Sequence, residues 1–205
     1  YLTGEEERLN ITLDDGSEVT LNHSSQLEVY EVFGEEDRTV SLKGEAFFNI
    51  KKNPDIPFMV LMNDRQVKVL GTSFSVSHRK DITIVSVRSG QVQLSNRTDS
   101  LFLKAKQKGV ITRQGKLNKQ TWEVNDLAWY NGVLSFEDKP MSEVVKILSR
   151  HTKKPVEVVL ELSNCTLTAK IEYERIDEVL NIIAETLEIN WKEEPKRILF
   201  YGKGC

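Results

Sequence analysis

The chain has 205 residues, of which 39% are hydrophobic and 29% charged, and its formal net charge is −3. This length allows one large domain or two small ones with adequate cores. The mildly acidic balance argues against nucleic-acid binding, which needs a basic surface, and no apolar run approaches the roughly 20 residues of a membrane-spanning helix. The chain opens at Tyr1 without an initiator Met, so we expect any anchoring segment to precede it.

From residue 9 to about residue 124 the sequence predicts short strands separated by turns at the spacing of all-β domains. Residues 9–13 alternate apolar and polar side chains, and the Asp-Gly step ending at Gly16 predicts a tight hairpin into 19–21. No fixed-length repeat is evident, so a sandwich and an irregular twisted solenoid both remain possible. Further strands are predicted at 26–30, 38–42, 46–51, 58–62, 66–70, 73–78, 82–87, 91–94, 101–104, 110–112 and 121–124.

Beyond Asn125 the apolar period changes from two residues to the helical 3.6. Pro140 opens a predicted helix whose apolar face carries Met141 and Leu148, and a second helix runs from about Ile176 to Leu187. Because the strand–helix–strand pattern occurs twice, we interpret this part as an internal duplication, with helices on one face of a small sheet. Its strands are predicted at 133–136, 156–160, 166–173, 189–192 and 198–201.

The predicted fold is therefore mainly β with an α+β part. An all-β domain, twisted solenoid-like or sandwich, spans residues 1–125, and a small duplicated βαβ domain spans residues 126–205.

No constellation of side chains predicts chemistry. His23, His78 and His151 are scattered, without a second ligand at metal-binding spacing. The acidic groups Asp14–Asp15 and Glu35–Asp37 lie beside glycines in predicted turns, where carboxylates accept backbone hydrogen bonds. We expect no enzyme, no cofactor and no metal site.

The chain has two cysteines, Cys165 and Cys205. Because Cys205 is the last residue, we expect that end to fray and no disulfide to form between them.

Six segments follow one another in a recognisable order: Leu13–Asn22, Val40–Phe48, Pro57–Val60, Val67–Val76, Leu103–Lys108 and Ala128–Phe136. In this order they resemble the periplasmic part of FecR-family anti-sigma regulators, particularly those of Bacteroidota. The duplicated C-terminal part is similar to the short secretin/TonB N-terminal (STN) module of those proteins. Ala105, where proline is usual, and Asn49, where an acid is frequent, depart from the pattern. The signature residues, which we interpret as structural, are Gly16, Gly44, Phe47, Phe48, Gly71, Phe74, Trp129 and Gly132.

The resemblance implies a sensor arm. In such systems a TonB-dependent outer-membrane receptor presents its periplasmic signalling domain to the FecR-like protein. The contact is relayed across the inner membrane and frees an extracytoplasmic-function (ECF) sigma factor. The resemblance therefore implies a periplasmic location, as the soluble part of a single-span inner-membrane protein, and sigma-factor contact only through a cytoplasmic part.

We expect recognition through exposed strand edges, where backbone hydrogen bonds give affinity and alternate side chains give selectivity. The candidate edges are 156–160 and 198–201, and the candidate partner-binding residues are Val156, Val158, Leu160, Ile198 and Phe200.

Two alternatives remain open. A carbohydrate-binding β module would use exposed aromatic side chains such as Tyr30, Phe33 or Tyr130. An architectural periplasmic module would instead associate with copies of itself.

Overall fold

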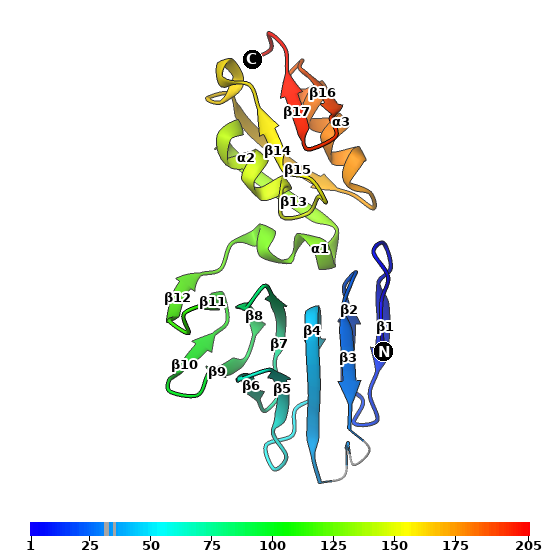
Figure 1. Cartoon of the computed structure of the whole chain (residues 1–205), viewed down its shortest axis with the longest axis vertical. Helices are drawn as coiled ribbons and strands as arrows, with labels where there is room; N and C mark the ends of the chain where they lie inside the picture. Colours follow the sequence, from blue (N-terminus) through cyan, green and yellow to red (C-terminus); the bar gives the residue numbers. More distant parts are fainter. Residues whose placement is uncertain (31–32, 35) are drawn as a thin grey trace. The chain divides into compact units, whose positions relative to one another are not determined.

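The computed structural model describes residues 1–30, 33–34 and 36–205. These form two compact units, unit 1 (Tyr1–Glu123) and unit 2 (Val124–Cys205) (Figure 1). Strands predominate, and among the described residues all helices belong to unit 2. This confirms the prediction of a mainly β protein with a small α+β part. Within the described residues, no helix is both long and apolar enough to span a bilayer.

Unit 1 is built on one continuous hydrogen-bonded path of strands, β10-β9-β6-β5-β4-β7-β8-β11-β12, with β1, β2 and β3 attached beside β4. The two ends of the path approach each other, since β10 contacts β11 and β12, so the sheet curls almost into a barrel. The strands are β1 (Leu9–Thr12), β2 (Glu18–Leu21), β3 (Gln26–Val29), β4 (Arg38–Asn49), β5 (Phe58–Met62), β6 (Arg65–Val69), β7 (Ser73–Arg79), β8 (Ile82–Ser89), β9 (Gln91–Ser95), β10 (Ser100–Lys104), β11 (Gln107–Ile111) and β12 (Leu117–Thr121).

Strand β4 connects the two layers of unit 1 because its partners change along its length. Its first half, residues 38–43, lies between β3 and the parallel strand β5, whereas residues 46–49 lie between β2 and β7. The change occurs at Gly44, whose φ of +100° is strained for any residue with a Cβ. A Cβ at Gly44 would also collide with Ser25. One glycine thus lets a single strand serve both layers.

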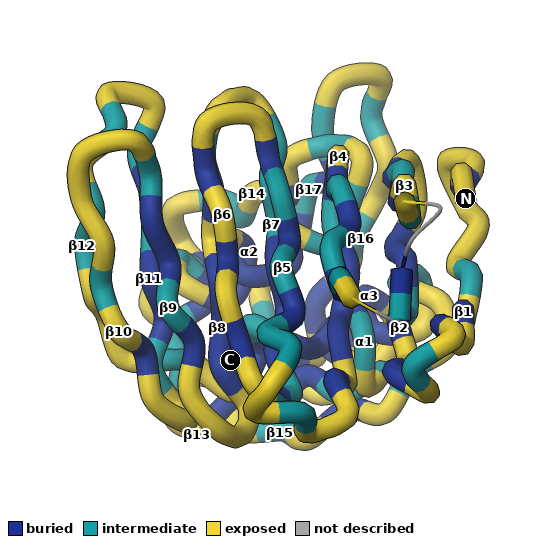
Figure 2. Tube along the Cα trace, turned by 90° about the horizontal axis from the view of Figure 1, so that it is seen from below, coloured by how far each residue is buried: buried dark blue, intermediate teal, exposed yellow. Residues whose placement is uncertain are grey.

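The core of unit 1 follows from the two-residue period of its strands. Buried and exposed residues alternate strictly along β6, as Figure 2 shows. The rings of Phe48 and Phe74 stack at 5.2 Å between centroids, and Phe58 packs edge-on against Phe48 at 6.1 Å. The predicted hairpin into β2 is confirmed: Gly16 has a φ of +78° and the Leu13 amide donates to the Ser17 carbonyl.

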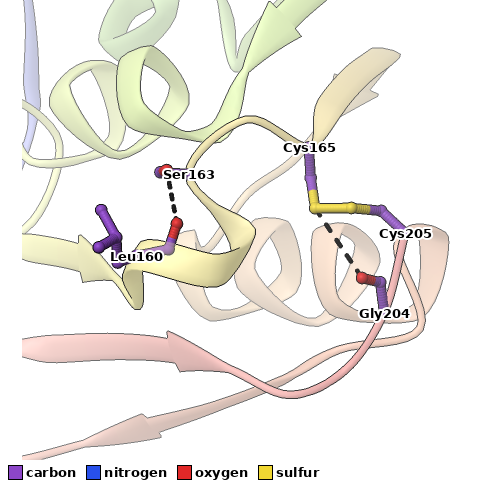
Figure 3. The surroundings of a disulfide bond; sticks show 5 residues. All are labelled: Leu160, Ser163, Cys165, Gly204 and Cys205. Carbon is purple, nitrogen blue, oxygen red and sulfur yellow. Dashed lines mark hydrogen bonds between the residues drawn. A yellow bond between two sulfur atoms is a disulfide. The ribbon is translucent and has the colours of Figure 1, made fainter.

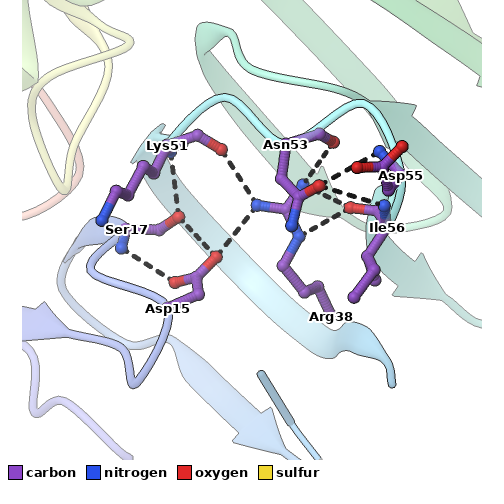
Figure 4. A network of polar contacts seen from close by, with 7 residues as sticks. All are labelled: Asp15, Ser17, Arg38, Lys51, Asn53, Asp55 and Ile56. Carbon is purple, nitrogen blue, oxygen red and sulfur yellow. Dashed lines mark hydrogen bonds and ion pairs between the residues drawn. The ribbon is translucent and has the colours of Figure 1, made fainter. Parts of the chain in front are cut away.

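A buried polar network holds the loop before β5 against this hairpin (Figure 4). The guanidinium of Arg38, whose side chain is 1% exposed, pairs with Asp15 at 3.1 Å. It also donates to the backbone carbonyls of Lys51, Asn53 and Ile56. Since a buried charge is tolerated only when it is paired and hydrogen-bonded, the loop and the hairpin depend on this one side chain.

Unit 2 contains two small sheets, and its two longer helices pack against both of them. The first sheet pairs β13 with β15, and the second has the order β14-β17-β16. Helix α2 contacts both sheets, and so does α3. The prediction of helices on one face of a single sheet is therefore wrong. The elements are η1 (Val124–Leu127), α1 (Ala128–Asn131), β13 (Val133–Pro140), α2 (Met141–Leu148), β14 (Val156–Val158), η2 (Leu160–Leu162), β15 (Thr166–Glu172), α3 (Ile176–Thr186), β16 (Asn190–Glu193) and β17 (Ile198–Tyr201).

The wide apolar surface of the helices explains this arrangement. Five of the eight residues of α2, including Val145 and Ile147, are buried, more than a single packed face requires. The first amide groups of α2 are satisfied by the chain ahead of β15: Met141 N–H donates to Cys165 O and Ser142 N–H to Ser163 O. The strand predicted at 121–124 is wrong, because the strand lies at Leu117–Thr121 and a 3-10 turn begins at Val124. The strand predicted at 156–160 ends at Val158, before a 3-10 turn that begins at Leu160.

A disulfide joins Cys165 to Cys205, with 5.9 Å between the Cα atoms (Figure 3). The expectation of two unpaired cysteines is therefore wrong. The last residues do not fray, because Gly204 packs closely against the Leu187 carbonyl and the Cys205 amide donates to that same carbonyl at 3.2 Å. The crosslink encloses β15, α3, β16 and β17.

Replacing Arg38 with Ala should lower the free energy of unfolding of unit 1 by about 3–5 kcal/mol, because Asp15 and three carbonyls lose their buried partner. Urea denaturation measures this change. Arg97→Ala is the control, since Arg97 is 81% exposed in its ion pair with Asp64 and should change stability by less than about 1 kcal/mol. Equal effects of the two substitutions would contradict the role of the network.

Reducing the disulfide, or replacing both cysteines with Ser, should lower the stability of unit 2 by about 2–4 kcal/mol, as expected for a closed loop of this length. The measurement is urea unfolding with and without dithiothreitol, together with thiol titration of the denatured chain. Two reactive thiols in the chain before reduction would show that the crosslink is absent.

Candidate protein-interaction edges

The residues considered for chemistry do not gather into a site. Among the described residues, no group of three or more His, Cys, Asp and Glu side chains is placed to hold a metal ion. Asp15 accepts hydrogen bonds from Ser17 and Arg38, which is a turn and core role, and Glu35 lies outside the described residues. His78 lies 2.9 Å from the Thr83 hydroxyl, and burial together with the nearby charge of Arg65 lowers the pKa of the imidazole.

The aromatic side chains considered for carbohydrate binding do not form a platform. Phe33 is 6% exposed and packs edge-on against Phe58 in the core, so it is unavailable to a ligand. Tyr30 is 45% exposed in unit 1, whereas the half-buried Tyr130 packs against Trp129 in unit 2. The arrangement gives carbohydrate binding no specific support.

The signature residues occupy structural positions. Those with rings are buried, and the glycines lie at turns or at close approaches of the backbone, as at Gly71 against Lys52. Gly132 ends α1 with a φ of +66°. The buried members are Phe47, Phe48, Phe74 and Trp129.

The strand order of unit 2 corrects one of the two predicted edges. Strand β17 lies between β14 and β16 and is hydrogen-bonded on both sides. Ile198 and Phe200 are therefore buried residues of a central strand, at 7% and 0% exposure, and 198–201 is not an edge. Sequence position alone carries no information about which strand is central.

The other predicted edge is short and partly closed. Strand β14 ends at Val158, and Leu160 lies in the following 3-10 turn with its side chain 83% exposed. At Val156 the outward amide donates to Ser149 Oγ at 2.8 Å, and the Ser149 hydroxyl lies within 3.3 Å of the Val156 carbonyl. The Ser149 proton is donated to the Val145 carbonyl at 2.6 Å, so the backbone of Val158 and the carbonyl of Val156 remain to meet a partner strand at this short edge.

The sheet of β13 and β15 has one closed edge and one open edge. The Tyr173 amide donates to the Gly132 carbonyl, which fixes the alternation of antiparallel hydrogen bonds along both strands. The backbone groups of Val133 and Ser135 consequently point away from β15. The Asn125 side chain binds both groups of Ser135, at 2.8 and 2.9 Å, and the Asn131 side chain accepts from the Val133 amide.

By the same alternation, the amide and carbonyl groups of Thr168, Lys170 and Glu172 point outward from β15. The strand pairs only with β13 in the described sheets, and its outward residues carry exposed side chains. The outward groups of Trp191 and Glu193 form a second, shorter open edge on β16. The apolar alternation over 166–173 predicts the strand β15 but does not show that it lies at an edge.

An open cavity of about 420 Å³ lies at the end of β15. Its lining includes Glu172, Glu174 and Glu178, together with Gly132 and Tyr173. No lysine or arginine is among the lining residues. Because like charges gather around a concave space, this end of the strand favours a positively charged group.

Comparison with known proteins places both units in one family. The family model described as FecR protein matches residues 1–93, within unit 1, and the model described as FecR, C-terminal matches residues 133–200, within unit 2. The chain belongs to the FecR family of anti-sigma factors. This confirms the resemblance carried by the ordered sequence segments. No curated protein matches the sequence.

Solved structures of an anti-sigma factor are also similar to this chain. Two crystal structures of a "putative anti-sigma factor" from Parabacteroides distasonis superpose on the whole chain, each with 27% sequence identity. Their TM-scores are 0.71 and 0.70, and the matches cover 100% of this chain and 99% and 98% of theirs. The likeness to these structures therefore spans the residues of both units.

Replacing Asn125 with Ala should destabilise unit 2 by about 1–3 kcal/mol, because the outward amide and carbonyl of Ser135 lose their partners. Asn125 is 5% exposed, so water does not readily replace its amide. Thermal unfolding measures the loss. Asn131→Ala, which removes one bond at an exposed position, is the control and should have the smaller effect.

Proposed function

We propose that this chain is the periplasmic sensor region of a transmembrane anti-sigma factor. In this proposal it binds the signalling domain of a TonB-dependent outer-membrane receptor, and the contact is relayed to an ECF sigma factor. The membrane span and the sigma-binding part belong to other residues of the protein. The FecR family is regulatory, and we propose no catalytic activity, cofactor or nucleic-acid partner for these residues.

The observation that carries this proposal is the pair of open strand edges in unit 2. On the other margins of the two sheets, several outward backbone groups are bound by the side chains of Ser149, Asn125 and Asn131. Open edges are the surfaces to which a partner adds a strand, and each added backbone hydrogen bond contributes about 1 kcal/mol net. An interface of this kind suits a contact that forms and releases during signalling, which buries on the order of 800 Å² or less per partner.

The disulfide supports the proposed compartment. Disulfides persist in oxidising environments such as the bacterial periplasm and are rare in the cytosol. The crosslink between Cys165 and Cys205 encloses half of unit 2, so its formation there stabilises the unit that we propose to meet the receptor.

The signalling domain of the receptor encoded beside this gene should bind the 205-residue chain with a dissociation constant in the micromolar range, as is usual for small transient interfaces. Isothermal titration calorimetry measures the binding, and the signalling domain of an unrelated receptor is the control. Absence of binding at tens of micromolar, with a chain that is folded by circular dichroism, would refute the proposal. Self-association in sedimentation, without receptor binding, would favour the architectural alternative.

A further inference from the structure

We infer that the outer edge of β15 is the surface that receives the partner, and that the partner supplies an extended segment with a lysine or arginine for the acidic cavity at the end of the strand. This inference rests on the proposed function and names its surface and the chemistry of its partner. Three features of unit 2 support it: the open backbone groups of β15, the charges beside them and the cavity at the end of the strand.

The first feature is the contrast between the two edges of one sheet. On β13 the outward groups of Ser135 are bound by a buried asparagine, so that edge is closed to a further strand. On β15 an amide and a carbonyl remain outward at each of Thr168, Lys170 and Glu172. This run is longer than the open edge of β16, which has the outward groups of Trp191 and Glu193. A partner strand therefore finds most hydrogen bonds on β15.

The second feature is the pair of opposite charges that this edge carries. A lysine at an outward position normally guards an edge by its charge, and Lys170 occupies such a position. Its ammonium group, however, lies 3.6 Å from the carboxylate of Glu172. The charge of Lys170 is thus partly neutralised by Glu172 on the same strand. An approaching strand therefore meets a pair of opposite charges at this edge.

The third feature fixes the chemistry of the partner. Cross-strand neighbours are favourable when their charges are opposite. A strand added to β15 therefore gains most from a carboxylate opposite Lys170 and a cationic side chain opposite Glu172, two residues away on the same face. Beyond Glu172 lies the cavity of about 420 Å³ with Glu174 and Glu178 in its wall.

One wall of this cavity is held in place. The carboxylate of Glu178 accepts the backbone amide of Glu174 at 3.1 Å, at the start of α3. The long, flexible side chain of a lysine or arginine can reach from the added strand into a space of this size, where the carboxylates meet its charge. The occupant that the charges favour is thus an extended segment with an acidic and a basic residue two positions apart.

Lys170→Pro tests the edge. The Lys170 amide points away from β13, so proline removes a hydrogen bond to the partner but none within the sheet. We expect at least a tenfold loss of affinity for the receptor signalling domain in calorimetry. Glu193→Pro makes the same change on the open edge of β16 and should bind as the wild type does. Circular dichroism and thermal unfolding verify that both variants are folded.

Glu174→Lys tests the cavity, and Glu185→Lys, on the exposed surface of α3 away from it, is the control with the same change of charge. We expect a several-fold loss of affinity for the first variant only, and a smaller salt dependence of the remaining binding. Amide exchange of the wild-type chain adds a readout that needs no variant. The amides of Thr168, Lys170 and Glu172 should gain protection when the signalling domain is added.

The outcomes separate the two proposals. Binding that Lys170→Pro and Glu174→Lys leave unchanged, without new protection on β15, overturns this inference and leaves the proposed function standing. Loss of binding with Glu193→Pro alone moves the interface to β16 and also overturns it. Absence of any binding by the wild-type chain overturns both. Self-association that Lys170→Pro abolishes would show that a second copy of the chain occupies the edge, which also contradicts the proposed partner.

Discussion

Backbone amide and carbonyl groups at the margin of a sheet must find partners or remain in water, and this requirement organises both units. Unit 1 meets it by curling one long sheet until its end strands approach each other, which requires a strand that can serve two layers. Gly44 makes that strand possible. Unit 2 is too small to close a sheet on itself, and it satisfies most of its margins with side chains instead.

The side chains that bind the outward backbone groups of unit 2 differ in the hydrogen bonds that they can make. Asn125 offers a donor and an acceptor at once, so a single buried amide replaces a neighbouring strand at Ser135. Ser149 binds only one group of Val156: its hydroxyl oxygen accepts the Val156 amide, while its proton is donated to the Val145 carbonyl at 2.6 Å. Where no such residue stands, the margin is available to another protein. Whether an outward backbone group is bound by a side chain of its own unit thus decides whether the edge supports the fold or can bind another protein.

Much of the fold could be predicted from local patterns. Alternation of apolar residues located most strands, and the Asp-Gly step located the first hairpin, because those features depend on neighbours in sequence. The order of strands could not be predicted in this way. It depends on which apolar faces pack together, and for that reason β17 was taken for an edge and β15 was not. The disulfide was missed for a related reason: the close packing of Gly204 on Leu187 is a tertiary contact that composition does not reveal.

The crosslink at Cys165 also determines how the chain carries a mechanical load. Tension applied between residue 1 and residue 205 passes from Cys165 directly through the sulfur atoms to Cys205. The residues between them, which would add about 130 Å if fully extended, contribute nothing to the length that can be drawn out. Strand β15 begins at the residue after Cys165 and belongs to this shielded loop. Tension therefore does not extend β15 directly, whereas β13, its partner in the sheet, lies on the part of the chain that carries the load.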